Sequence, residues 1–303
     1  SDEIRVILVG KQDMIAKELE KYEYAKEDIE VVHASEIIDM GDVPTVAIKD
    51  KKDSSLVVAM RLVREGKADA LVSAGSTGAV LVGGQLVVGR LKGIKRPPLA
   101  PFIPTTKGFS LLIDCGANVD ARPEHLVQFA QMGSIYYENV MGKKNPTVAL
   151  LNIGTEEEKG NQLVKDTKPL MKECKNINYI GSVEARELVS GAADVIVCEA
   201  FVGNVVLKFF EGLALTLFGS LKEGLMSSTR TKLGALLVKP ALKGLKNQFD
   251  TSSQGGAPLL GLKGLVVKAH GNSSSKEIEI ALKQCISFKK QKINEKIKES
   301  ICD

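Results

Sequence analysis

Short apolar runs alternate with helical patterns along most of this chain, and that alternation constrains the fold more than any other feature. Several runs are continuously apolar, as in strands that helices cover on both faces. Strands are expected at 5–9, 30–33, 70–73, 110–114, 147–152, 177–180, 194–198 and 265–268. Between the second and third of these, Leu56, Met60 and Val63 have helical spacing. The sequence therefore predicts an α/β protein with a doubly wound, mostly parallel sheet.

The length and continuity of the chain favour a single α/β domain over residues 1–303, because no repeat or low-complexity linker divides it. Residues 205–250 differ from the rest. They are helical without an obvious strand, and we expect them to form an excursion that packs against a second copy of the chain. A lysine-rich amphipathic helix is expected from Ser275 to about Ser300.

Composition excludes several classes of protein. A net charge of only +4 and the absence of tryptophan argue against nucleic-acid binding. Five cysteines without a Cys-x-x-Cys pair, together with three histidines, predict reduced thiols in a cytoplasmic protein with no metal and no cofactor. No apolar run reaches the length of a membrane span, and none resembles a signal peptide.

The apolar run Leu111-Leu112-Ile113 ends in the most informative stretch of the sequence. Ligands of open α/β sheets bind outside the carboxyl ends of the strands. The side chains expected to line such a site are Asp114, Asn118, Asp120 and His125. The alternative is a simple helix start, with Asp120 as N-cap and Pro123 and Glu124 in the first turn. Both interpretations can hold.

Glycine-rich turns follow two further strands. The turn Gly75-Ser76-Thr77-Gly78 opens a helix, and its small residues allow backbone amides to approach an anion. It matches neither the dinucleotide nor the Walker fingerprint, so a tight strand-to-helix turn remains the alternative. His270-Gly271 follows the last strand and is interpreted as a general base or an anion contact, against a purely structural histidine.

Polar residues follow three more strands. After the strand at 147–152 come Thr155 and Lys159, where the lysine either contacts an anionic substrate or pairs with Glu156 or Glu157. Glu184 follows the next strand. Asn204 stands at a helix entrance, where it either donates to a substrate oxygen or caps the helix. Its neighbours Gly203 and Lys208 complete this group. Together the five strand ends suit a phosphate-bearing ligand.

Eight blocks of the sequence resemble the PlsX family of bacterial phosphate acyltransferases. The blocks occur in the family's order over nearly the whole chain. They are SAGSTGA at 73–79, GRLKGIKRPPLAP at 89–101, DCGANVDARPEHL at 114–126, NIGTEEEKGN at 152–161, GSVEAR at 181–186, FVGNVVLK at 201–208, GGAPLLGLK at 255–263 and KAHGNSSS at 268–275. Ser76 replaces the usual asparagine, and the family's N-terminal strand with its Asp-Ala-Met-Gly-Gly-Asp loop is absent from this sequence.

The resemblance implies a fold related to phosphate acetyltransferase and isocitrate dehydrogenase. It also implies a homodimer built by the long helices. The reaction it implies converts acyl-[acyl carrier protein] and inorganic phosphate to acyl phosphate and free carrier protein, for phospholipid synthesis. On this basis Lys159 is expected to orient phosphate. Asn204, with backbone amides near Gly203 or Gly75, is expected to stabilise the thioester oxyanion.

Two basic segments are expected to bind macromolecular partners. The acidic carrier protein is expected to dock on Arg90, Lys92, Lys95 and Arg96, against the alternative of a solvated loop. An anionic membrane surface is expected to bind a helical tip that Pro240 breaks into two arms, against the alternative of a dimer core. The tip residues are Leu233, Leu236, Leu237, Lys239 and Lys243. The protein would then be cytoplasmic, peripherally membrane-associated, and a neighbour of a downstream glycerol-3-phosphate acyltransferase.

Two other functions remain open on the sequence. One is a short-chain phosphate acyltransferase that uses coenzyme A, for which the sequence shows no decisive contact. The other is a catalytically idle membrane scaffold for lipid-synthesis enzymes, against which the retained Lys159, Asn204 and glycine turns argue. A dehydrogenase is less favoured, because no Gly-x-Gly-x-x-Gly follows a strand.

Overall fold

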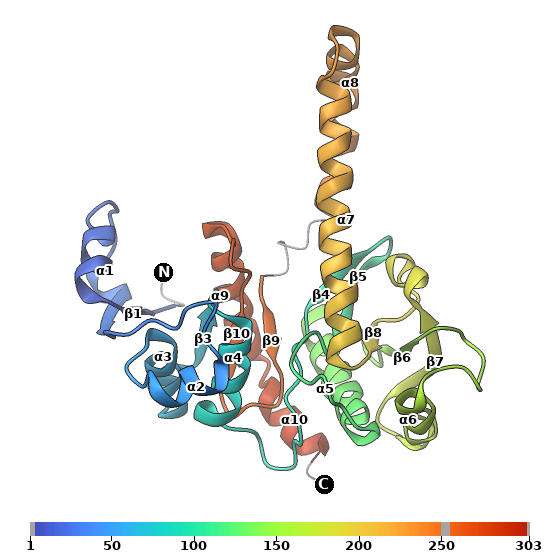
Figure 1. Ribbon diagram of the computed structural model, residues 1–303, viewed down its shortest axis with the longest axis horizontal. Coiled ribbons are helices and arrows are strands. Elements are labelled where there is room, and N and C mark those ends of the chain that lie inside the picture. Colours follow the sequence, from blue (N-terminus) through green and yellow to red (C-terminus); the bar gives the residue numbers. More distant parts are fainter. Residues whose placement is uncertain (1–3, 250–254, 302–303) are drawn as a thin grey trace. The chain divides into compact units, whose positions relative to one another are not determined.

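The computed structural model describes residues 4–249 and 255–301, and its contacts divide the chain into two compact units (Figure 1). Unit 1 comprises Ser1–Leu99 and Gln254–Asp303, and unit 2 comprises Ala100–Ser253. The sequence predicts one domain with a helical excursion, whereas the contacts group the excursion with unit 2. The two units are described separately below.

Unit 1 contains two small sheets. β1 (Val6–Gly10) pairs in parallel with β2 (Ile29–His33), and the second sheet has the order β3-β10-β9. In this second sheet β3 (Ala70–Ser73) is parallel to β10 (Leu265–Lys268), and β9 (Ala257–Leu259) is antiparallel to β10. The helical segments are α1 (Gln12–Leu19), η1 (Lys26–Asp28), α2 (Pro44–Asp50), α3 (Ser55–Arg64), α4 (Thr77–Gly83), the π-helical η2 (Gly84–Val88), α9 (Ser275–Lys290) and α10 (Ile293–Ile301).

Unit 2 is built on a five-stranded sheet of order β4-β5-β8-β6-β7. β4 (Phe102–Thr105) is antiparallel to β5 (Gly108–Ile113), while β8 (Val195–Val197), β6 (Thr147–Asn152) and β7 (Asn178–Glu184) are parallel to it. β8 is fully buried, and so are the apolar runs Leu111–Ile113 of β5 and Val148–Leu151 of β6, as in strands covered on both faces. The helical segments are α5 (Pro123–Met141), α6 (Gln162–Glu173), η3 (Ala185–Ser190), α7 (Ala200–Met226) and α8 (Thr229–Gln248).

The expected fold class is confirmed: the protein is α/β, and most described strand pairs are parallel. The sequence analysis missed β4 and β9, the two short antiparallel strands at sheet edges. Both contain a proline, which an edge strand accommodates because its outer face needs no ladder donor. The C-terminal helix is also divided, since α9 ends before Lys292, whose φ is 53°.

Helices α7 and α8 form a hairpin that extends from the sheet of unit 2 (Figure 1). The expectation that Pro240 breaks this segment is wrong. The chain turns at Ser227–Ser228 because Ser228 caps α8, its Oγ accepting the Thr231 amide at 3.2 Å, and α8 continues through Pro240.

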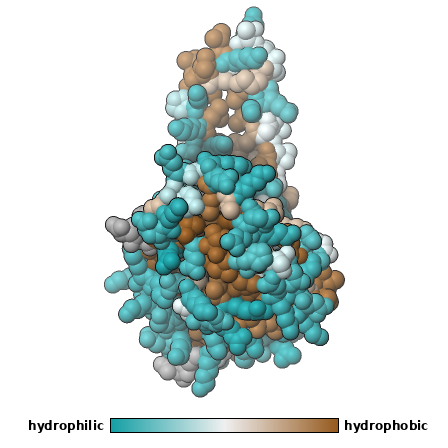
Figure 2. Space-filling view, turned by 90° about the vertical axis from the view of Figure 1, so that its left-hand side faces the viewer, coloured by the Kyte–Doolittle hydropathy of each residue, from teal (hydrophilic) through white to brown (hydrophobic). Residues whose placement is uncertain are grey.

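The hairpin leaves most of its apolar side chains exposed (Figure 2). Within its described residues only Ala200, Gly203 and Ala235 are buried. By length and composition alone, α7 is apolar enough to cross a membrane, which corrects the expectation that no segment has this property. The few charged residues of α7 interrupt its apolar run in the sequence, but they leave the helix as a whole apolar.

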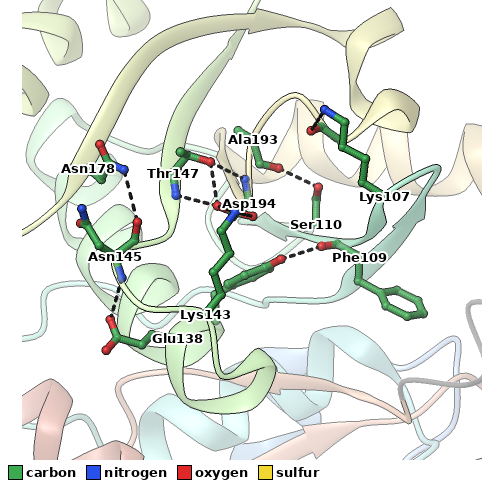
Figure 3. Close-up of polar contacts among 12 residues, drawn as sticks. Lys107, Phe109, Ser110, Glu138, Lys143, Asn145, Thr147, Asn178, Ala193 and Asp194 are labelled. Carbon is green, nitrogen blue, oxygen red and sulfur yellow. Dashed lines mark hydrogen bonds and ion pairs between the residues drawn. The ribbon is translucent and has the colours of Figure 1, made fainter.

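At the amino ends of the unit 2 strands, Asp194 joins β8 to β6 (Figure 3). Its Oδ2 accepts hydrogen bonds from the Thr147 amide at 2.7 Å and the Thr147 hydroxyl at 2.8 Å, and Lys143 Nζ lies 2.7 Å away. Burial raises the pKa of this carboxyl, but the Lys143 and Thr147 donors outweigh burial and hold the pKa below its ordinary value. Asp194 therefore stabilises the edge opposite the candidate site.

Candidate active site

The loop after β5 is shaped by the buried carboxylate of Asp114. Asp114 Oδ2 accepts hydrogen bonds from the Asn118 amide at 2.8 Å and from Asn118 Nδ2 at 2.7 Å, while Oδ1 accepts the Ala117 amide at 3.2 Å. Asp114 and Asn118 thus meet as the sequence predicts, but they bind each other. Their observed role is to fix the path of the loop around Gly116, whose φ is +119°.

The expectation that Asp120 caps α5 is wrong. The helix begins at Pro123, so its N-cap is Arg122, and Asp120 is exposed outside the helix. The residue before a proline is held in extended backbone, which fits Arg122 with φ −115° and ψ 162°. His125 Nδ1 accepts the Arg122 amide at 3.1 Å, so the buried His125 closes the helix start.

The first turn of α7 packs directly on the end of β5. Glu199 is the N-cap, and its Oε2 accepts the Val202 amide at 2.9 Å. A Cβ on Gly203 would overlap the Asp114 carbonyl oxygen, so only glycine allows this approach. The Ala200 amide donates to Asn118 O at 3.2 Å. Sheet, loop and helix are therefore locked together here.

Asn204 lies above the glycine loop and does not cap the helix, because Glu199 does. Its Oδ1 is 3.8 Å from the position that a Cβ would occupy on Gly116. The side chain is exposed, and its carboxamide has no hydrogen-bond partner among residues 4–249 and 255–301. An exposed, unpaired donor is thereby held at the carboxyl end of a buried strand.

The loop after β6 carries Lys159 in an ion pair. Lys159 Nζ lies 2.7 Å from Glu156 Oε1, and both side chains are about half exposed. The hydrogen bond that Lys159 Nζ donates to the Glu156 carboxylate is the main reason that the pKa of Lys159 is raised, and the same bond lowers the pKa of Glu156. The pairing that the sequence analysis left open is thus formed here, on an accessible rim.

Lys168 is a residue of this region that the sequence analysis missed. It is almost completely buried, and its Nζ donates to three loop carbonyls, those of Glu156 at 2.9 Å, Glu157 at 2.8 Å and Lys159 at 3.0 Å. Its spacing to Val164 and Met171 on α6 places a cation within an apolar helix stripe, and this was the available signal.

The remaining predicted residues of unit 2 lie around the same sheet edge. Glu184 is the parallel neighbour of Asn152 and pairs with Arg186 at 3.0 Å, and Thr155 is exposed beside the Lys159 loop. Lys208 pairs with Glu211 at 2.7 Å along α7. The structure therefore gathers these strand ends of unit 2 at one edge.

Two predicted turns meet within unit 1. Ser76 caps α4, with its Oγ accepting the Ala79 amide at 3.5 Å, and Thr77 begins the helix. The Ala269 amide donates to Ser73 O at 2.9 Å, so His270 and Gly271 follow a strand that adjoins the Gly75 turn. A Cβ on Gly78 would lie 2.6 Å from Pro44 Cγ, so this turn is tightly packed.

The cysteines at the strand ends are unsuited to nucleophilic catalysis. Cys115 and Cys198 are fully buried, and burial raises the pKa of both thiols well above the ordinary value. Of the residues that the structure describes, none form a His, Cys, Asp and Glu cluster able to hold a metal ion. The exposed groups include the Asn204 carboxamide and the Lys159 ammonium, which can bind oxyanions, together with the carboxylates of Glu156 and Glu157.

Comparison with known proteins identifies the family. Residues 1–296 match the family model described as "Fatty acid synthesis protein". The chain is 54% identical over 299 residues to "Phosphate acyltransferase" of Alkaliphilus oremlandii, covering 99% of this chain and 89% of the relative. It is 50% identical over 300 residues to the protein of that name from Clostridioides difficile, covering 99% and 88%. The chain belongs to the family of these phosphate acyltransferases.

The family fixes the class of enzyme as an acyltransferase. Solved structures support the fold: a phosphotransacetylase from Streptococcus pyogenes aligns with TM-score 0.62 at 17% identity, covering 99% of this chain and 87% of that one. A branched-chain phosphotransacylase from Enterococcus faecalis aligns with TM-score 0.56 at 16% identity, covering 94% and 98%. At this identity they show the fold alone.

Proposed function

We propose that this acyltransferase converts acyl-[acyl carrier protein] and inorganic phosphate to acyl phosphate and free carrier protein, as a step of bacterial phospholipid synthesis. The observation that carries the proposal is the exposed, unpaired Asn204 carboxamide beside Gly116, within a chain of the phosphate acyltransferase family. Such a donor suits a carbonyl oxygen that gains charge during reaction.

The proposed reaction needs no activated side-chain nucleophile. A phosphate oxygen attacks the thioester carbonyl carbon, a carbon–oxygen bond forms, the carbon–sulfur bond breaks, and the leaving thiolate takes up a proton. Asn204 Nδ2 donates to the carbonyl oxygen as charge develops. Lys159 orients phosphate, exchanging its contact with Glu156 for one with the anion. One oxyanion donor is worth roughly 10²–10³ in rate.

The exposed hairpin supports two further parts of the proposal, a homodimer and peripheral attachment to the cytoplasmic membrane face. Leu236 and Leu237 are 67% and 84% exposed, and Lys239 and Lys243 stand on the same helix. These residues lie within α8 and not at the Ser227–Ser228 turn, and exposed apolar and cationic side chains along one helix suit an anionic lipid surface. A lipid-soluble acyl phosphate made there would pass readily to a glycerol-3-phosphate acyltransferase.

The deciding experiment compares acyl donors. Acyl phosphate formation is measured with long-chain acyl carrier protein and with acyl coenzyme A, with and without inorganic phosphate. The proposal expects phosphate-dependent product from the carrier protein at a much higher kcat/KM. Preference for short-chain acyl coenzyme A would favour the alternative enzyme. A folded protein with no product from either donor would favour the scaffold.

A further inference from the structure

A basic pocket on unit 1 has no role in the site described above. Its volume is about 600 Å³, and its lining residues come from the end of α2, from α3 and from η2. Four cations line it, Lys49, Lys52, Arg61 and Arg64. All four are exposed, so they present charge to solvent around a shallow hollow.

The positive charge of this pocket is only partly offset within the described chain, because the Glu65 carboxylate interacts electrostatically with Arg61 and Arg64 and the Asp53 carboxylate with Arg61. None of the four cations forms an ion pair or a side-chain hydrogen bond with residues 4–249 or 255–301. The one carboxylate of the lining, Glu65, is 2.8 Å from Lys67. Clustered like charges repel each other. An anionic partner relieves this repulsion, because its charges attract all four cations.

The pocket also contains an apolar centre. Leu86, which is 68% exposed, lines the pocket together with the buried Ile48 and Val57. A free anion makes no use of an exposed leucine. A protein that presents carboxylates around an apolar side chain uses both features, since interfaces combine an apolar core with a polar rim.

We propose that Lys49, Lys52, Arg61 and Arg64, arranged around Leu86, form a docking face for an acidic protein. The identity of that protein rests on the proposed function: it is the carrier that delivers the acyl group. Leu86 stands ten residues after the Ser76 cap on the continuous α4–η2 helix, roughly 15 Å at the usual helical rise. Arg90, by contrast, donates its guanidinium to Lys95 O within its own loop.

The test measures binding and turnover separately. The full chain with Lys49→Glu and Arg64→Glu is compared with a control carrying Lys17→Glu and Lys26→Glu, which makes the same change of net charge elsewhere on unit 1. Binding of fluorescent acyl carrier protein is titrated at low and high salt. The docking variant is expected to raise Kd roughly tenfold at low salt, while the control shifts it little. A third variant, Leu86→Ser, should weaken binding equally at both salt concentrations.

Each result decides the proposal. Equal weakening by docking and control variants overturns it, because net charge alone would then explain the effect. Inorganic phosphate that binds the pocket of the unaltered chain, and does not bind the docking variant, overturns the proposal because the site would then be one for a small anion. A changed oligomeric state of the docking variant also overturns it, because the face would then bind a second copy of the chain. Phosphate-dependent turnover by the unaltered chain tests the proposed function independently. If the docking variant loses carrier-protein binding but the unaltered chain shows no phosphate-dependent turnover, the docking face is supported and the proposed function is contradicted.

Discussion

Asn204 Oδ1 lies 3.8 Å from the position of a Cβ on Gly116, so the first helical turn of α7 reaches over the loop that ends β5. The two residues are 88 positions apart in sequence, by the difference of their numbers. Gly203 makes the contact possible because it brings α7 against the Asp114 carbonyl. The position of the candidate donor therefore depends on a glycine that carries no chemistry itself.

Gly203→Ala tests this dependence. The added methyl group would overlap the Asp114 carbonyl oxygen, so the free energy of unfolding should fall by roughly 1–3 kcal/mol and activity should be lost. Gly219→Ala is the matched control on the same helix, where a Cβ meets no atom within 4 Å, and it should be neutral or stabilising by about 0.5–1 kcal/mol. Chemical denaturation measures both, and equal effects would contradict the packing argument.

Asn204→Asp replaces the amide donor with a carboxylate of the same shape. Glu199 retains the cap, so the fold should be preserved. We expect kcat to fall by roughly 10²–10³ because the oxyanion loses a donor. Circular dichroism checks the fold and an acyl phosphate assay checks turnover. Retained activity would exclude Asn204 as the donor.

Lys159→Ala should raise the KM for phosphate roughly tenfold, because a charged hydrogen-bond donor is removed. Lys172→Ala is the matched control, since Lys172 pairs with Glu157 of the same acidic run at 2.7 Å. Glu156→Gln should have the opposite effect and lower the KM, because it frees Lys159 from its carboxylate. Phosphate titrations give the KM of each of the three variants. Equal KM values for phosphate in all three would show that Lys159 does not bind phosphate.

Asp194→Asn should lower the free energy of unfolding at pH 7 by about 2 kcal/mol. The carboxyl pKa is lower in the folded protein than in the unfolded chain, so the charged form favours folding. Its contribution is present above the ordinary value of 3.8 and is lost as pH falls through the folded value. Denaturation curves of the variant and the unaltered protein should therefore converge in acid. A constant difference at all pH values would contradict the assignment.

Leu236→Glu with Leu237→Glu should abolish sedimentation with anionic vesicles and leave turnover on carrier protein intact. Met14→Glu with Tyr22→Glu is the control, because these apolar side chains of unit 1 are similarly exposed. Analytical ultracentrifugation follows the oligomeric state. Dissociation of a dimer by the Leu236→Glu, Leu237→Glu variant would identify the two leucines as interface residues and contradict the membrane role.

The fold was predictable where burial dictates sequence. β6 and β10 were predicted with their observed bounds, because burial on both faces demands continuous apolar residues, and the half-buried β3 was predicted with its observed bounds as well. β4 and β9 were missed, since two short edge strands leave little periodic signal. The break predicted at Pro240 is wrong, although proline usually disrupts a helix interior, because the chain turns instead at the serine pair 227–228.

The candidate site was predictable in outline because strand ends meet at one sheet edge. The sequence could not decide whether Asn204 or Glu199 caps α7, because both are suitable residues near the helix start. It could not show that Asp114 and Asn118 bind each other, which depends on the path of the loop. Lys168 was missed because surface exposure is the normal state of lysine.

Lys168 separates two properties of the rim that carries Lys159. Its ammonium fixes backbone carbonyls from beneath, while the side chains of Glu156, Glu157 and Lys159 extend outward. The backbone conformation of the rim is thus set by one buried cation. The surface charge of the rim is set by other residues, whose side chains do not hold the backbone in place. Natural variation can therefore retune the attraction of this edge for anions, one side chain at a time, without rebuilding the loop.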